Sequence, residues 1–152
     1  ALRDVKFEYL TVHALGGNEM VKQAKKAANE LDPNIKILAV TILTSISKHE
    51  LSKMGTNSSI EDMVVQLAKN SSDADGYVAS ALEIKLLKEK VSKDKIIFCP
   101  GIRMPQDSKD DQARTTTPAL ALKNGASAII LGRSLLQGDV NKNIEKVLDS
   151  IK

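Results

Sequence analysis

The chain has 152 residues, of which 42% are hydrophobic, 27% charged and 3% aromatic, and its formal net charge is +3. These values describe a globular domain and exclude a disordered or fibrous chain. Lys and Glu alternate along the sequence without forming a basic stripe, and the chain has two Phe, two Tyr and no Trp. A protein that binds nucleic acid normally clusters its positive charge and offers aromatic rings for stacking, so this class is disfavoured.

No apolar run approaches the roughly 18 residues that a membrane span needs. The opening residues ALRDVKFEYL have no basic head followed by an apolar stretch, so no signal peptide is predicted. Cys99 is the single cysteine, which leaves no internal disulfide and no cysteine metal cluster. A chain of this kind is typical of a reducing compartment, and we expect it in the cytoplasm.

In chain order, short apolar runs rich in β-branched residues alternate with amphipathic stretches at helical spacing. The predicted strands are Phe7–Val12, Ile35–Leu43, Gly76–Ala79, Lys95–Cys99 and Ala128–Leu131. The predicted helices are Asn18–Leu31, Ile60–Ala68, Ala81–Val91, Thr115–Lys123 and Asn141–Ile151. Several strands are almost continuously apolar, as parallel strands buried on both faces are. Five alternations without a break predict one α/β domain with a parallel sheet.

The strands begin about 30 residues apart, close to the roughly 31 residues per unit of a (β/α)8 barrel. Five units cannot close an eight-stranded barrel. The spacing therefore leaves two architectures open: a doubly wound open sheet, or a barrel without its first strands.

In both architectures ligands bind at the carboxyl ends of the strands. There the sequence places hydroxyl groups, glycines and two arginines, and the most informative segment is ILGRS at 130–134. A glycine followed by an arginine after a buried strand suits a phosphate, because the backbone can approach the anion and the guanidinium can clamp it. The alternative is that Gly132 only makes a turn and Arg133 is solvated.

The long connection Cys99–Thr117 has no apolar period, which is typical of a lid or binding loop. Its candidate anion ligands are Arg103, Gln112 and Arg114. The alternative is that the connection is a solvated surface loop without a ligand. Asp110 and Asp111 lack further residues at metal-ligand spacing, so no metal site is predicted. The sequence has neither a GxGxxG nor a GK[ST] loop, which disfavours nucleotide-triphosphate and dinucleotide folds.

Three other residues have alternative interpretations. His13 follows the first strand and is either a general acid or base or, as we favour, a hydrogen-bonded structural histidine. His49 is expected to be solvated on a short polar helix. Cys99 is expected to be a small core residue.

Five motifs in this order, TVHALGG, AVTILTS, PGIR, DDQARTTTP and ILGRS, resemble the orotidine 5′-phosphate decarboxylase family of the bacterial type. The resemblance runs from Phe7 to about Ile151 and implies strands four to eight of a (β/α)8 TIM barrel. It implies substrate-binding roles for six residues. Thr44 would contact the pyrimidine or the ribose-phosphate side, and Pro100 would line the pyrimidine pocket through its backbone. The phosphate would be held by Arg103, Gln112, Gly132 and Arg133.

The family converts orotidine 5′-phosphate to UMP in pyrimidine biosynthesis without a metal or organic cofactor, through a ring carbanion stabilised by a lysine ammonium. That lysine belongs to a D-x-K-x-x-D segment of the first three strands. Asp4 and Lys6 do not match this segment because the third acid is missing. The resemblance therefore implies that the catalytic lysine and aspartates lie upstream of Ala1.

We accordingly expect residues 1–152 to be one domain, the C-terminal portion of the barrel, with no catalytic residue and no activity alone. A homodimer is implied, without nucleic acid or membrane as a partner. The alternatives are a non-catalytic phosphate-binding barrel fragment and a related sugar-phosphate lyase such as hexulose-phosphate synthase.

Overall fold

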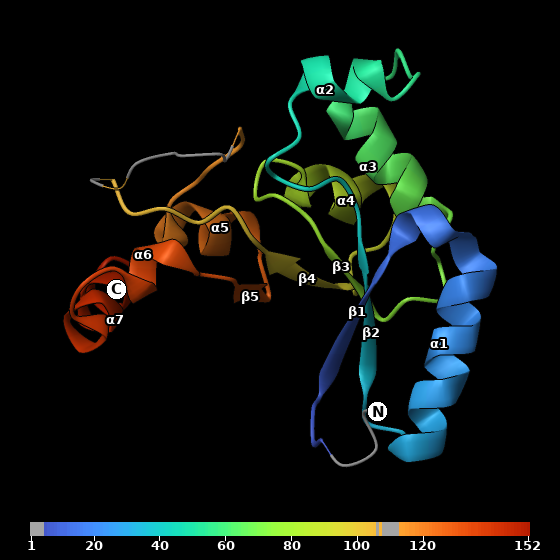
Figure 1. Cartoon of the computed structure of the whole chain (residues 1–152), viewed down its shortest axis with the longest axis horizontal. Coiled ribbons are helices and arrows are strands. Elements are labelled where there is room, and N and C mark those ends of the chain that lie inside the picture. Colours follow the sequence, from blue (N-terminus) through green and yellow to red (C-terminus); the bar gives the residue numbers. More distant parts are fainter. Residues whose placement is uncertain (1–4, 106, 108–112) are drawn as a thin grey trace.

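The computed structural model describes residues 5–105, 107 and 113–152 (Figure 1). The strands are β1 (Tyr9–His13), β2 (Lys36–Val40), β3 (Gly76–Val78), β4 (Ile96–Cys99) and β5 (Ala128–Ile129). The helices are the short 3₁₀ turn η1 (Ala14–Gly16), α1 (Gly17–Leu31), α2 (Lys48–Lys53), α3 (Ile60–Lys69), α4 (Ile84–Lys90), α5 (Pro118–Asn124), α6 (Arg133–Leu136) and α7 (Val140–Asp149).

The five strands form one parallel sheet whose spatial order, β1-β2-β3-β4-β5, is the order of the chain. The register pairs Thr11 with Leu38, Ala39 with Tyr77, and Cys99 with Ile129. A doubly wound sheet reverses its strand order at a switch point, whereas this sheet adds every new strand on the same side. The sheet order therefore favours the barrel over the doubly wound alternative.

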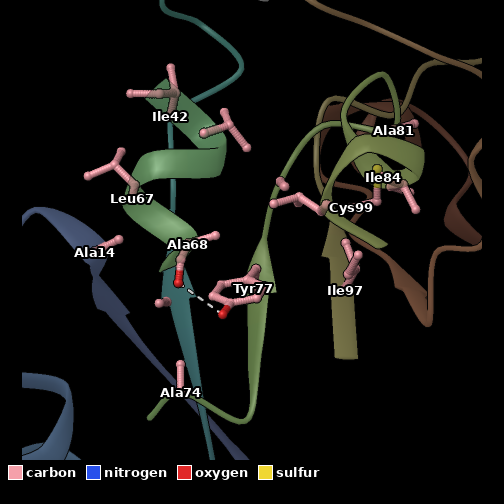
Figure 2. Packing of buried hydrophobic residues seen from close by; sticks show 14 of the residues in the cluster. Ala14, Ile42, Leu67, Ala68, Ala74, Tyr77, Ala81, Ile84, Ile97 and Cys99 are labelled. Carbon is pink, nitrogen blue, oxygen red and sulfur yellow. Dashed lines mark hydrogen bonds between the residues drawn. The ribbon is translucent and has the colours of Figure 1, made fainter. Parts of the chain in front are cut away.

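The main hydrophobic core lies between the helices and one face of the sheet. Strand residues that share this face by register include Ile37, Tyr77 and Ile97, all at most 1% exposed. Figure 2 shows Tyr77 beneath α3, where its Oη donates a hydrogen bond of 3.0 Å to the carbonyl oxygen of Ala68. Val64 of α3 and Leu87 of α4 belong to the same core.

The opposite face of the sheet is curved. The rings of Tyr9 in β1 and Phe98 in β4 lie with centroids 4.7 Å apart, although two strands separate them. In a flat sheet, strands three positions apart would be about 14 Å apart. Tyr9 and Phe98 meet because the sheet bends toward this face, as the wall of a barrel does.

The two outer strands have free edges in the described part of the chain. β1 pairs with β2 and β5 pairs with β4. The expectation that strands are buried on both faces is wrong for β1, whose residues alternate between exposed and half-buried. It holds for β3, which is buried throughout. β3 is buried because strands flank it on both sides, whereas β1 has a neighbouring strand on one side only.

The predicted helices are all present, with shifted ends. Ser59 caps α3 by accepting a hydrogen bond from the backbone N–H of Asp62, and Thr117 caps α5 with Pro118 in its first turn. The helix predicted from Ala81 begins only at Ile84, so Leu82 is 58% exposed instead of packed.

The second predicted strand, Ile35–Leu43, is shorter in the structure and ends at Val40. Beyond it, the backbone N–H and the hydroxyl group of Thr41 both donate to the carbonyl oxygen of Val78. None of the described helices is long and apolar enough to cross a membrane.

Candidate functional site

Five of the six predicted site residues lie at the carboxyl end of the sheet. Thr44 follows β2, Pro100 and Arg103 follow β4, and Gly132 and Arg133 follow β5. The sixth, Gln112, lies outside the described residues. Thr44 and Arg103 are buried, at 5% and 9% exposure, whereas Gly132 and Arg133 are exposed. Burying a guanidinium is costly unless it is paired, and Nη1 of Arg103 donates a hydrogen bond of 3.0 Å to the carbonyl oxygen of Ile102.

The long connection folds back on itself next to β2. We call residues 100–103 the first limb and residues 113–117 the second limb. The backbone N–H of Thr116 donates to the carbonyl oxygen of Gly101 (3.1 Å), and that of Arg103 donates to the carbonyl oxygen of Thr116 (2.9 Å). The N–H of Arg114 donates to the carbonyl oxygen of Thr44 (3.1 Å). The two limbs and the end of β2 are therefore joined by main-chain hydrogen bonds.

Gly101 is needed where the limbs meet. Its φ of +73° lies in the left-handed region. A Cβ atom at this position would come within 2.7 Å of the carbonyl oxygen of Arg114 and 3.1 Å of Cγ2 of Thr44. The absence of a side chain thus lets Thr44, the first limb and the second limb approach one another.

The Gly132-Arg133 pair lies beside the first limb. Ser134 donates its hydroxyl proton to the carbonyl oxygen of Ile102 at 3.4 Å, a long hydrogen bond that joins the start of α6 to the PGIR segment. The N–H of Leu135 donates to the carbonyl oxygen of Gly132 at 3.0 Å and closes the turn. A Cβ atom on Gly132 would meet nothing within 4 Å. The surface over Gly132 is open, which leaves an anion free access to its backbone.

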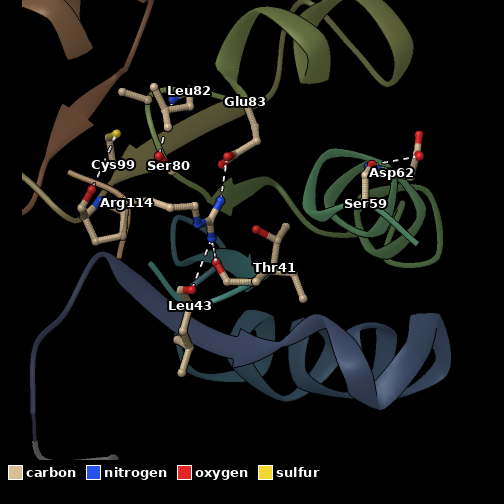
Figure 3. Close-up of polar contacts among 12 residues, drawn as sticks. Thr41, Leu43, Ser59, Asp62, Ser80, Leu82, Glu83, Cys99 and Arg114 are labelled. Carbon is tan, nitrogen blue, oxygen red and sulfur yellow. Dashed lines mark hydrogen bonds and ion pairs between the residues drawn. The ribbon is translucent and has the colours of Figure 1, made fainter. Parts of the chain in front are cut away.

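The prediction that Arg114 is an anion ligand is not supported, because its guanidinium binds other groups (Figure 3). Nη1 donates to Oε1 of Glu83 at 2.5 Å, and Nη2 donates to the carbonyl oxygens of Ile42 (3.0 Å) and Leu43 (3.1 Å). The sequence reasoning missed Glu83 altogether. Its signal was a lone acid three residues after Ser80, in the otherwise small and apolar segment that follows β3.

Burial shifts the pKa values of Glu83 and Cys99. The side chain of Glu83 is 1% exposed, and burial raises the pKa of its carboxyl although the Arg114 guanidinium opposes the shift. Burial, with a contribution from the Glu83 charge, raises the pKa of the Cys99 thiol to about 12. Cys99 is fully buried and is the core residue that the sequence predicts.

The remaining sequence predictions concern histidines, metals and the catalytic segment. His49 lies exposed on α2, as expected for a solvated side chain. His13 lies exposed at the end of β1, and none of the described hydrogen bonds involves its side chain, so the favoured prediction of a hydrogen-bonded structural histidine is not supported. Within residues 5–105, 107 and 113–152, no group of three or more His, Cys, Asp or Glu side chains could hold a metal ion. Ala1, upstream of which the catalytic lysine and aspartates are expected, lies outside the described residues, as do Asp4, Asp110 and Asp111. The position of the catalytic segment stays a prediction.

A parallel sheet in chain order, helices on its outer face and two arginines at its carboxyl end define five βα units of a (β/α)8 barrel, with an end suited to an anionic ligand. The sequence matches the family described as "Orotidine 5'-phosphate decarboxylase / HUMPS family" over residues 1–146. The chain belongs to this family.

Individual relatives agree with this assignment. The chain is 44% identical over 137 residues to the orotidine 5′-phosphate decarboxylase of Fusobacterium nucleatum, covering 88% of this chain and 58% of that protein. It is 41% identical over 159 residues to the enzyme of Lactobacillus gasseri, covering 100% of this chain and 66% of the relative. The chain therefore spans about three fifths to two thirds of the length of these relatives.

Solved structures extend the comparison. The crystal structure of orotidine 5′-phosphate decarboxylase from Lactobacillus acidophilus superposes with a TM-score of 0.80 at 34% identity, covering 99% of this chain and 66% of that one. The enzyme from Pyrococcus horikoshii superposes with a TM-score of 0.63 at 21% identity, covering 95% of this chain and 61% of that one, and supports the fold alone.

Proposed function

We propose that this chain is the part of an orotidine 5′-phosphate decarboxylase that holds the substrate phosphate and part of the pyrimidine site. The family match over residues 1–146 carries the proposal. It is supported by the gathering of Thr44, the first limb and the Gly132-Arg133 pair at one end of the sheet. The product would be UMP, and the pathway would be pyrimidine biosynthesis.

In this proposal the phosphate is bound by Arg103, Gln112, Gly132 and Arg133. Arginine suits a phosphate because its planar fork donates two parallel hydrogen bonds. Thr44 and the backbone of Pro100 would contact the pyrimidine and its ribose. Phosphate contacts lie far from the bond that breaks, so they accelerate the reaction only when their binding energy is expressed in the transition state. Ordering of the long connection over the phosphate is a way to achieve this.

We assign no catalytic residue to this chain. The 152 residues contain no D-x-K-x-x-D segment, and the reaction requires a lysine ammonium to stabilise the ring carbanion and supply the proton. In this proposal that segment is encoded upstream of Ala1, and we expect the isolated 152-residue chain to be inactive. No metal or organic cofactor is required.

The test is to express the chain from its complete reading frame and follow the ultraviolet loss of orotidine monophosphate. Arg133→Ala should lower kcat/KM about 10- to 150-fold, the equivalent of one charge-assisted hydrogen-bonding group. Part of the activity should return with added guanidinium ion, which replaces the missing cation. Lys142→Ala removes an exposed cation of α7 and serves as the matched control, with unchanged kinetics. Arg133→Ala kinetics equal to those of the control would refute the phosphate role.

Two other functions give different results in the same experiment. A non-catalytic phosphate-binding barrel, whose complete reading frame would also lack a D-x-K-x-x-D segment, would bind UMP without any turnover. A sugar-phosphate lyase such as a hexulose-phosphate synthase would turn over a sugar phosphate and not orotidine monophosphate, and its activity would depend on a divalent cation.

The assembly and location follow from the same proposal. We infer a cytoplasmic homodimer that binds the small-molecule substrate and neither nucleic acid nor membrane. Sedimentation of the protein expressed from its complete reading frame should give twice the protomer mass, and cell fractionation should recover it in the cytoplasmic fraction. A monomer, or recovery with membranes, would contradict this inference.

A further inference from the structure

Arg114 joins three parts of the chain that are distant in sequence. Its guanidinium binds the carboxylate of Glu83, which follows β3, and the carbonyl oxygens of Ile42 and Leu43, which follow β2 (Figure 3). Its own backbone belongs to the second limb. The side chain is 10% exposed and that of Glu83 is 1% exposed, so this ion pair lies inside the molecule.

Such a pair is not explained by stability. Removing two charges from water costs several kcal/mol, and a buried ion pair often contributes no more than apolar side chains of the same size. Oε2 of Glu83 and Nε of Arg114 find no partner among the described residues, which adds to that cost. A buried pair is better suited to fixing the position of the segments that it joins.

The segments that it joins belong to the candidate phosphate site. The Arg114 backbone N–H binds the carbonyl oxygen of Thr44, and two residues later Thr116 exchanges hydrogen bonds with Gly101 and Arg103. A continuous path of hydrogen bonds therefore runs from Glu83 through Arg114 and the second limb to Arg103. Movement of the Arg114 guanidinium would release the second limb from β2 and, with it, the support of Arg103.

We propose that Glu83 is a positioning residue for phosphate binding: by holding Arg114 it fixes the second limb against β2 and, through Thr116, sets the place of Arg103. This inference rests on the proposed function. In the proposed complex with substrate, neither Glu83 nor Arg114 contacts the substrate. Their effect is confined to ligands that carry a phosphate, because the limbs support the phosphate end of the site.

The test compares dissociation constants for UMP and for uridine, which lacks the phosphate, by NMR titration of the protein expressed from its complete reading frame. Glu83→Gln and Arg114→Met should each weaken UMP binding about tenfold, as loss of a charge-assisted contact does, and change uridine binding less than about twofold. The double variant should be no weaker than Arg114→Met alone, because both changes break one path. Arg114→Lys, which keeps the charge, should recover part of the UMP affinity.

The matched control is the Lys25–Asp75 ion pair, at 2.7 Å, near the opposite end of the sheet. Asp75→Asn should lower the melting temperature and leave the ratio of UMP to uridine affinity unchanged. An unchanged ratio in folded Glu83→Gln or Arg114→Met protein would overturn the positioning role. UMP binding that is absent in the unmodified protein would instead overturn the proposed function and this inference with it.

Discussion

Replacing Gly101 by alanine should disturb the candidate site through the backbone alone. The change adds one methyl group at a residue whose φ is +73°. That methyl group would lie 2.7 Å from the carbonyl oxygen of Arg114, closer than real Cβ atoms approach a backbone atom. Since Arg114 is fixed by Glu83 and by the end of β2, the second limb cannot move away without breaking those hydrogen bonds.

The expected loss of stability has two parts. A non-glycine residue in the left-handed region costs roughly 1–2 kcal/mol. Forcing an extra methyl group into a closely packed place costs typically about 1–3 kcal/mol more. Gly101→Ala should therefore lower the free energy of unfolding by about 2–5 kcal/mol.

Gly55→Ala is the matched control. Gly55 has a φ of +85°, and a Cβ atom there would meet nothing within 4 Å. Both variants also stiffen the unfolded chain equally, so this effect cancels in their difference. Denaturant unfolding of the protein from the complete reading frame should show Gly101→Ala to be less stable than Gly55→Ala by about 1–3 kcal/mol. Equal losses would refute the argument that close contact between the limbs requires Gly101.

Three further predictions concern single side chains. Tyr77→Phe removes the hydrogen bond to Ala68, whose carbonyl keeps a backbone donor, so denaturant unfolding should show a loss of about 1 kcal/mol; a loss above about 3 kcal/mol would contradict this. With a pKa of about 12, the Cys99 thiol is ionised in roughly one molecule in 10⁴ at pH 8. A thiol reagent should label it only on unfolding, and full labelling of native protein within minutes would contradict its burial. Burial by itself raises the pKa of Asp75. Hydrogen bonds from Lys25 and from the backbone N–H of Ile37 outweigh this effect and hold the pKa below its ordinary value of 3.8. The ionised Asp75 carboxylate therefore stabilises the folded protein fully above the unfolded-state pKa, and this stabilisation is lost as pH falls through the lower, folded-state pKa. Asp75→Asn should accordingly flatten the acid limb of a plot of unfolding free energy against pH.

The fold was predictable because each unit carries its own pattern. The alternation of apolar runs and amphipathic stretches gives the parallel sheet, and helix starts such as Ser59 and Thr117 have local signals. Strand spacing alone did not separate the two α/β architectures. The separation depends on the strand order and on the curvature that brings Tyr9 to Phe98, and both are properties of the whole sheet.

The candidate site was only half predictable. Arg103 and Arg133 could be placed at the carboxyl end of the sheet because they follow predicted strands. The role of Arg114 could not be read from its neighbours, since its acceptors Ile42 and Leu43 are 72 and 71 positions away in the chain. Glu83 was missed because a single acid after a strand has no spacing that distinguishes it from a solvated residue.

The strand order also has a consequence for how the protein is made. Residues paired across the sheet are only 20 to 38 positions apart, so each strand emerging from a ribosome finds its partner among the residues synthesised just before it. Short loops close at little entropic cost, and co-translational folding proceeds from the N-terminal side. The contact between Arg114 and the end of β2 spans a far longer loop. Assembly of the sheet should thus precede assembly of the ligand site, which becomes competent only after all five described strands have formed.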